Sequence, residues 1–252
     1  SAEYHNTEND YLNIENINVA LRELYATYYF NSGEFSFGKK MFAIGSVDEN
    51  SPVDHFNPYN YYYLLLGGLD KKVPVNFLSF ELYLENNWKN FSPLVCAIFP
   101  PLGLFIDGEF SLSAAISPEH NINHYPNNDS EYELSLPVNP EWYRFLEPKG
   151  SKHESFLSIK RSNLMNEFTL TYLRAYDRVF SLSGFTIHEF LGNNTFYPPD
   201  YWFTYRLNET LNLGSIFLFD DFTLRTDLAI LHSFDRYTKN DYMSLKHTND
   251  II

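Results

Sequence analysis

The chain contains a single cysteine, Cys96, among its 252 residues. An internal disulfide framework and a zinc site built on cysteines are both excluded, because each needs at least two thiols. Cys96 lies in the apolar run 94–99, where a small buried side chain is a commoner role for cysteine than a reactive thiol. We therefore expect no cysteine chemistry.

Long apolar runs are missing as well. No segment approaches the ~20 consecutive apolar residues that a membrane-spanning helix needs, which excludes a bundle of spanning helices. Basic residues are few, since 18 Lys and Arg stand against 32 Asp and Glu and the formal net charge is -14. Because nucleic-acid binding depends on basic patches that contact phosphates, we expect no nucleic-acid partner.

Sequence patterns of catalytic and metal sites are also scarce. The chain has no Gly-x-Ser-x-Gly stretch, the pattern that places a nucleophilic serine on a tight turn. His120 and His124 have the spacing of two metal ligands on a helix, but Pro118 and the Asn- and Pro-containing stretch 121–126 are typical of a loop. We therefore expect a protein that is not an enzyme and that has neither a metal site nor a cofactor.

Aromatic residues, in contrast, are abundant. They make up 18% of the chain, with 23 Phe and 20 Tyr against 3 Met, a bias that favours strands over helices. In the segment 78–85, Leu and Phe alternate with Ser, Glu and Tyr, so that a strand has one apolar and one polar face. The same alternation occurs in the segments 34–39, 167–172, 201–207 and 222–230. The sequence predicts an all-β fold.

Two all-β architectures fit this pattern. One is an antiparallel transmembrane β-barrel, in which the apolar faces contact lipid, and the other is a soluble sandwich, in which they form a core. Aromatic residues gather at the predicted strand ends 28–30, 61–63 and 197–205, where a membrane barrel carries aromatic girdles. This favours the membrane barrel.

The chain shows no internal repeat and no linker, which predicts a single domain over 1–252. Short turn signals include Asn31-Ser32-Gly33 and Asp220-Asp221, whereas long polar loops are expected near 45–59 and 117–150. Short turns on one side and long loops on the other are typical of bacterial barrels. We expect the loop 117–150 to be external or to plug the interior.

An ordered series of motifs between Leu21 and Pro101 resembles the alginate-export-like outer-membrane β-barrels and their uncharacterised relatives. The motifs are Arg22-Glu23-Leu24-Tyr25, Phe35-Ser36-Phe37-Gly38-Lys39-Lys40, Gly45, Asp48, Asp54-His55-Phe56-Asn57-Pro58, Lys72-Val73-Pro74 and Phe99-Pro100. The runs 172–178 and 224–229 agree more loosely with later strands of the family. The chain departs from the family pattern at Lys40, Ile44, Tyr59 and Ala175, where the family has Gln, Trp, often Arg, and Gly.

The resemblance implies a bacterial outer-membrane location and a channel or export barrel that passes a solute, a polysaccharide or a lipid-related molecule. It implies outer-membrane lipid, a small-molecule or polymer substrate, and a periplasmic or inner-membrane export partner as the contacts of the protein. Barrels of this family are larger than ~10 strands, so we expect either a part of a larger barrel or a smaller relative.

Charged residues on or near the predicted polar faces are the candidates for lining a channel and selecting what passes. They are Arg22, Glu34, Lys40, Glu81, Lys160, Arg206, Arg225 and Asp227. The alternative role of each is a static salt bridge between neighbouring strands. In the first long loop, turn-forming residues predict a folded-in turn that braces the interior. These are Asp48, Asp54, Asn57 and Pro58.

Two further functions stay open. A secreted soluble β-sandwich would bind glycans through exposed aromatic residues such as Trp88, Trp142 and Trp202. An outer-membrane lipid hydrolase would carry its catalytic residues on a small barrel. Extraction with and without detergent separates the soluble sandwich from a membrane barrel, because only a membrane barrel places Phe37, Leu78, Phe80, Leu82, Leu170 and Leu224 against lipid.

Overall fold

The protein is all-β in a computed structural model, as the sequence predicts. The structure describes residues 2–4, 17–19, 22–47, 51–61, 71–84, 108–125, 143–148, 150–186 and 200–235. The high content of aromatic residues, which favour strands, therefore predicted the fold class correctly. Within these ranges we find no helix of the length and apolar character needed to cross a membrane.

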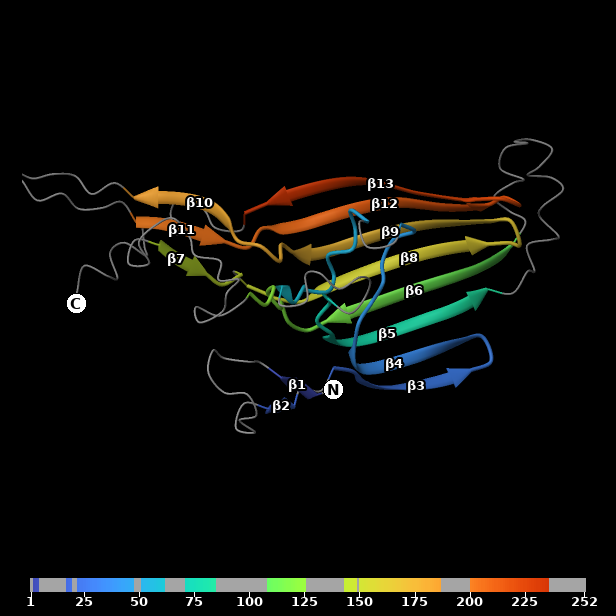
Figure 1. The fold of residues 1–252 in the computed structure, drawn as a ribbon, viewed down its shortest axis with the longest axis horizontal. Helices are drawn as coiled ribbons and strands as arrows, with labels where there is room; N and C mark the ends of the chain where they lie inside the picture. Colours follow the sequence, from blue (N-terminus) through green and yellow to red (C-terminus); the bar gives the residue numbers. More distant parts are fainter. Residues whose placement is uncertain are drawn as a thin grey trace, which may run out of the picture.

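The main element is an eight-stranded sheet in the order β13-β12-β9-β8-β6-β5-β4-β3, in which every neighbouring pair is antiparallel (Figure 1). Its strands are β3 (Leu24–Phe30), β4 (Gly33–Lys40), β5 (Val75–Leu84), β6 (Glu109–Ser117), β8 (Glu154–Ser162), β9 (Asn166–Tyr176), β12 (Leu207–Leu218) and β13 (Thr223–Phe234). The sheet is open in the described part of the chain, because β3 and β13 are its two edges and do not pair with each other.

Two small sheets accompany the large one. β1 (Ala2–Tyr4) pairs with β2 (Ile17–Val19), and β10 (Ser181–Thr186), β11 (Asp200–Thr204) and β7 (Tyr143–Leu146) form a three-stranded sheet. β7 lies within the predicted loop 117–150, so part of that segment is a strand. The predicted strand 201–207 is divided, because β11 ends at Thr204 and β12 begins in the large sheet at Leu207.

Three tight hairpins lie at one end of the large sheet (Figure 1). Their turns span residues 31–32, 163–165 and 219–222. In the second turn, the Asn163 side-chain oxygen accepts the backbone N–H groups of Met165 and Asn166 at 2.9 and 2.8 Å, a local closure that favours Asn. Directly after the first turn, at the start of β4, a side chain at Gly33 would meet the Glu81 carbonyl oxygen, so glycine is required there. The connections at the other end of the sheet are longer.

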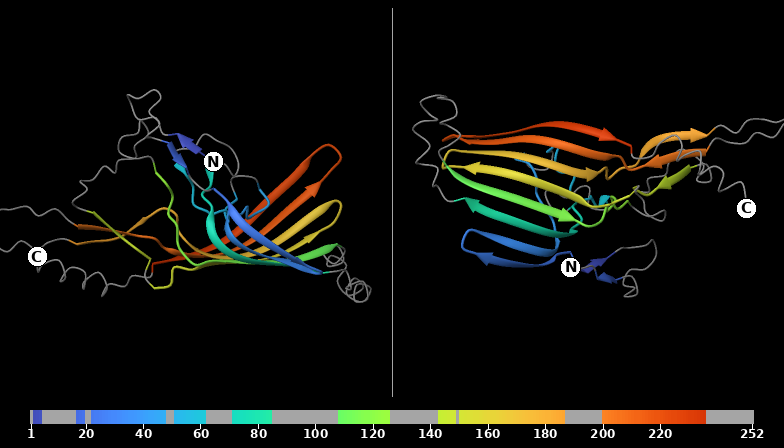
Figure 2. Two further views of the ribbon diagram at one scale, coloured as in Figure 1. Left: turned by 90° about the horizontal axis from the view of Figure 1, so that it is seen from below. Right: turned by 180° about the vertical axis from the view of Figure 1, so that it is seen from behind.

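The sheet curves like a trough (Figure 2). The loop 41–61, of which the structure describes 41–47 and 51–61, lies with these residues on the concave side of the sheet (Figure 2). We call this side the inner face and the opposite side the outer face. Cross-strand register places Glu34, Ser79, Ser113 and Ser158 on the inner face, directly opposite one another or nearly so in successive strands. The inner face of the large sheet is therefore largely polar.

The outer face is mostly apolar, although it carries the ion pair of Arg174 and Glu209 toward the loop-rich end. The residues that the sequence predicts to share one face all lie on the outer face in the observed register. They are Phe37, Leu78, Phe80, Leu82, Leu170 and Leu224. Glu81, Thr169, Arg225 and Asp227 lie on the inner face. The predicted division of these side chains between two faces is confirmed, because the two-residue period of each strand persists without a bulge through the large sheet.

The buried core lies between the loop 41–61 and the inner face, away from the hairpin end. It comprises Ile44, Val53, Phe56, Val75, Leu173 and Ala175. Aromatic rings extend it, since the ring centroids of Phe42 and Phe77 lie 4.9 Å apart and those of Phe56 and Phe156 5.3 Å apart, both edge to face. The predicted long loop near 45–59 is thus packed onto the sheet.

A pair of leucines on β9 tests which face holds the core. Leu173 is fully buried on the inner face, whereas Leu170 is 45% exposed on the outer face. We expect Leu173→Ala to lower the free energy of unfolding by about 2–5 kcal/mol, because it leaves a cavity. Leu170→Ala should cost clearly less in detergent. Equilibrium urea unfolding of both variants checks this, and equal losses would contradict the position of the core.

Candidate functional site

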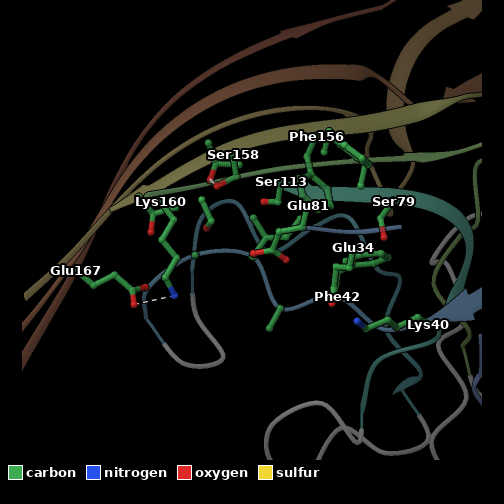
Figure 3. Close-up of a pocket in the computed structure, with 18 residues that line it drawn as sticks. Glu34, Lys40, Phe42, Ser79, Glu81, Ser113, Phe156, Ser158, Lys160 and Glu167 are labelled. Atoms are coloured by element: carbon green, nitrogen blue, oxygen red, sulfur yellow. Dashed lines mark hydrogen bonds and ion pairs between the residues drawn. The ribbon is translucent and has the colours of Figure 1, made fainter. Parts of the chain in front are cut away.

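A polar hollow of about 240 Å³ lies between the loop 41–61 and the inner face of the sheet (Figure 3). Its loop side is formed by the residues Phe42–Gly45. The side chains on its sheet side come from five successive strands and are mostly hydroxyl-bearing or charged. They include Glu34, Lys40, Ser79, Glu81, Ser111, Ser113, Phe156, Ser158, Lys160, Glu167, Thr169 and Thr171. The hollow can therefore hold water or a polar solute.

Charged groups of both signs face this hollow. Glu34 stands directly opposite Glu81 in the β4–β5 register. The Lys160 amine lies 2.7 Å from the Glu167 carboxylate, so this pair neutralises itself across β8 and β9 (Figure 3). The Lys40 amine lies 4.9 Å from the centre of the Tyr25 ring, a cation-π contact.

Half of the predicted channel-lining residues meet in the hollow, namely Glu34, Lys40, Glu81 and Lys160. Arg225 and Asp227 lie on the inner face of β13, in register with Ile216 and Gly214 of β12. The remaining two precede strands. Arg22 stands before β3, 3.9 Å from the Met41 sulfur, and Arg206 stands before β12.

Asp227 binds the loop. Its carboxylate accepts the Ser46 N–H at 3.0 and 3.1 Å and the Val47 N–H at 2.9 Å. The Asn212 side-chain amide donates to it from β12 at 3.2 Å. Gly214, its neighbour in register, leaves room for this contact, since a Cβ there would lie 2.7 Å from an Asp227 oxygen. Sequence analysis found the correct face for Asp227 and missed this anchoring role.

The residues of the predicted loop turn brace the loop against the sheet. The fully buried Asn57 side chain accepts the Phe42 N–H at 2.8 Å and donates to the Val73 carbonyl at 2.9 Å. The Pro58 carbonyl accepts the Val73 N–H at 2.7 Å. Asp54 forms a buried ion pair with Lys72, and burial raises the pKa of the Asp54 carboxyl despite the neighbouring amine. Asp48 lies outside the described residues.

A buried ion pair between Arg178 and Glu154 holds four segments together at the end of the sheet opposite the hairpins. The two Glu154 oxygens accept Arg178 N–H groups at 2.5 and 2.9 Å, and both side chains are almost fully buried. Arg178 also donates to the carbonyls of His55 and Asn121 at 2.9 and 2.8 Å. The His120 ring nitrogen lies 3.0 Å from Glu154.

Sequence analysis missed this cluster because its members come from four separate segments. Glu154 begins β8, Arg178 follows β9, and His55 and Asn121 belong to two loops. The spacing of residues within one segment cannot predict a contact between segments that are distant in the sequence. The run 172–178, which ends in Arg178, was the available signal, but it does not single out Arg178 among the other basic residues.

The histidine spacing that the sequence offers as a metal pattern is used in another way. His120 contacts Glu154, whereas His124 is exposed and its backbone N–H and carbonyl bond Tyr59 and Tyr61. Among the residues that the structure describes, no three His, Cys, Asp or Glu side chains are grouped to bind a metal ion.

Comparison with known proteins adds no relatives. Neither a protein-family profile, nor a curated protein, nor a solved structure matches the chain.

The buried ion pair predicts a large stability effect. Glu154→Gln removes the counter-charge of Arg178, so we expect the free energy of unfolding to fall by about 3–5 kcal/mol. The matched control is Glu167→Gln, which breaks the more exposed pair with Lys160 and should cost less than about 1 kcal/mol. Urea unfolding compares the two, and a small loss at Glu154 would contradict the role of the pair.

His55 predicts a pH dependence. Burial, with the nearby Arg178 charge, lowers the pKa of His55 from 6.5 to about 4. Between these values the unfolded chain binds a proton that the folded chain does not, so stability should fall as the pH drops from 6.5 to 4. At about 1.4 kcal/mol per pKa unit, the loss reaches at most about 3.5 kcal/mol.

The measurement is the difference in unfolding free energy between the protein and His55→Asn as a function of pH. Because the variant retains the other titrating groups, including Asp54, their contributions largely cancel in the difference. A difference that stays constant from pH 7 to pH 4 would contradict the burial of a neutral His55.

Proposed function

We propose that this chain forms the wall of a transmembrane β-barrel in a bacterial outer membrane, and that a polar solute passes along its inner face. The observation that carries the proposal is the opposite character of the two faces of one sheet. Each of the eight strands exposes at least one large apolar side chain on the outer face. Examples are Tyr28, Phe37, Leu78, Ile116, Leu157, Leu170, Leu213 and Ile230.

Water is an unfavourable solvent for such a surface. Soluble monomers rarely expose contiguous apolar patches of more than a few hundred Å², and each buried side chain of this size contributes about 1.5–3 kcal/mol. Lipid removes this cost, and it requires that the backbone polar groups be paired between strands, as they are inside this sheet. Several of the strands are 9–12 residues long, which suits a tilted crossing of the hydrocarbon layer.

The side chains at the hairpin end also support a position of the sheet in a membrane. Exposed aromatic and apolar side chains gather at its turns, including Tyr28 beside the first turn, Met165 in the second, and Phe219 and Phe222 in the third. Aromatic girdles at the interface between lipid and headgroups have this composition. In this proposal the three hairpin turns and the connection 85–108 between β5 and β6 lie at one membrane surface, and the remaining connections lie at the other.

A membrane wall needs both sheet edges to be paired. β3 and β13 run in opposite directions, because an even number of strands in an antiparallel order separates one edge from the other. Each can therefore continue an antiparallel barrel with a further strand. In the proposed barrel the lipid contacts the outer face, and a small-molecule or polymer substrate contacts the inner one. An export partner is proposed from the family resemblance alone.

The glycan-binding alternative receives less support. Trp202 is 2% exposed and cannot stack on a sugar, and Trp88 and Trp142 lie outside the described residues. In a sandwich a second sheet would cover the outer face, yet its leucines and phenylalanines are exposed in the described structure. For a lipid hydrolase, the described residues offer a hydroxyl–imidazole contact between Ser151 and His153 on an exposed segment before β8. The other His153 ring nitrogen lies 3.1 Å from the Arg174 guanidinium and not from a carboxylate, so within the described part of the chain this pair lacks the acidic partner of a catalytic triad.

Neighbouring residues of β5 test the orientation of the wall. In a chain with Cys96→Ala, we expect Glu81→Cys to react quickly with a water-soluble thiol reagent and Phe80→Cys to react slowly after insertion into liposomes. Both cysteines should react in the urea-unfolded chain, which controls for intrinsic reactivity. Equal labelling of the two in liposomes would contradict the lipid contact of the outer face.

Passage itself is tested in a planar bilayer. Detergent-extracted protein should insert and give ion conductance, whereas Leu78→Lys, which places a charge on the outer face, should insert poorly. Lys on the inner face in place of Ser79 is the matched control and should insert normally. A chain that stays soluble without detergent and never conducts would contradict the proposed function.

A further inference from the structure

The loop that leaves β4 crosses the whole trough. It starts after Lys40 on β4, next to one edge of the sheet, and reaches the Asp227 carboxylate on β13, the opposite edge, at Ser46 and Val47. We call residues 42–47 the strap. Beyond it, Asn57 and Arg178 hold residues 55–57 to the sheet end.

This crossing is possible because the sheet is curved. Six strand spacings of about 4.8 Å separate β4 from β13, or about 29 Å along the sheet. The six residue steps from Lys40 to Ser46 span at most about 21 Å when fully extended. The strap therefore runs as a chord across the concavity, and the strap and the curved sheet together form a ring.

The ring surrounds the polar hollow. Phe42, Ala43, Ile44 and Gly45 of the strap form one side, and inner-face residues of β4, β5, β6, β8 and β9 form the other (Figure 3). Toward the loop-rich end, the core residues Ile44, Phe56 and Leu173 fill the space between this segment and the sheet. A solute that moves along the inner face must therefore displace the strap to widen this gap, whose dimensions depend on where the strap is held.

We propose that the strap is the constriction of the passage and that Asp227 is the positioning residue that latches it. This inference rests on the proposed function, because a constriction has meaning only if a solute passes. In the latch, the backbone N–H groups of Ser46 and Val47 donate to the Asp227 carboxylate. Both hydrogen bonds are strong because the acceptor is charged. The side chains of Phe42 and Ile44 pack in the core and hold the first part of the strap, so Asp227 sets the position of its far end at Ser46 and Val47.

Two glycines support a close latch. Gly45 has a φ of +105°, and a Cβ there would lie 2.1 Å from the Ser51 hydroxyl and 2.9 Å from an Asp227 oxygen. Gly214 lies beside Asp227 in the β12–β13 register, and a Cβ there would meet the Ser46 hydroxyl at 2.3 Å. Because neither glycine carries a side chain, the backbone of the strap can approach the Asp227 carboxylate closely.

The first test is Asp227→Asn, in the Cys96→Ala background. The amide keeps the size of the carboxylate and loses the charge that holds two N–H groups, so the strap should release. We expect single-channel conductance to rise by about twofold or more, with passage of larger neutral polymers, because the narrowest section of a pore limits both. Asp221→Asn, an equal charge change in the exposed turn of the same hairpin, is the matched control and should leave both unchanged.

A disulfide lock separates positioning from general damage. Cβ atoms at Ser46 and Gly214 would lie 3.2 Å apart, close to the 3.5–4.5 Å of disulfides. Adding Ser46→Cys and Gly214→Cys to Asp227→Asn should return the conductance to the parent value when the lock is oxidised, and reduction should raise it again. A merely structural loss at Asp227 would not be reversed by a bond to the strap.

Each outcome decides something. If the parent protein conducts and neither Asp227→Asn nor reduction of the lock changes conductance or polymer size limit, the strap inference is overturned while the proposed function stands. If the parent protein never conducts, the proposed function fails and the inference with it. Should Asp227→Asn not assemble, Gly45→Ala displaces the strap without altering the sheet, and unchanged conductance there overturns the inference too.

Discussion

The buried pair of Arg178 and Glu154 is the interaction on which the arrangement of the loops depends. Removing two charges from water costs several kcal/mol each, and this cost is offset only if nearly every donor and acceptor of the pair is used. Arg178 meets this condition by also bonding the carbonyls of His55, Phe56 and Asn121. Because the buried Arg178 guanidinium needs hydrogen-bond acceptors, two loops are held at the ends of two strands.

The fixed loops in turn create the interior. His55 and Phe56 belong to the segment that covers the inner face, so the pair sets where Phe56 packs on Phe156. Asn57 adjoins them and connects Phe42 to Val73, and Phe42 bounds the polar hollow. The chain therefore has a dry core at the loop-rich end and a wet hollow nearer the hairpins, both beneath the same segment.

Local sequence patterns predicted the sheet well and the contacts between segments poorly. The alternation of Leu and Phe with Ser and Glu in 78–85 is a property of one strand, and the two-residue period carries it directly into the face assignment of Phe80 and Glu81. The turn chemistry of Asn57 and Pro58 is equally local. Asp227 had the right face from this period, but its partners Ser46 and Val47 lie 181 and 180 residues away, and no period reports them.

The distance along the chain between Ser46 and Asp227 also has a kinetic consequence. Hairpins such as β8–β9 and β12–β13 close through turns of a few residues and can form within microseconds. The bonds between the first loop and β13 join residues that are 181 positions apart, and they cannot exist until the whole sheet has been made. Asn57 and Asp54 of this loop can already bond Val73 and Lys72, which are close in sequence, but Ser46 and Val47 must stay unattached until β13 is in place.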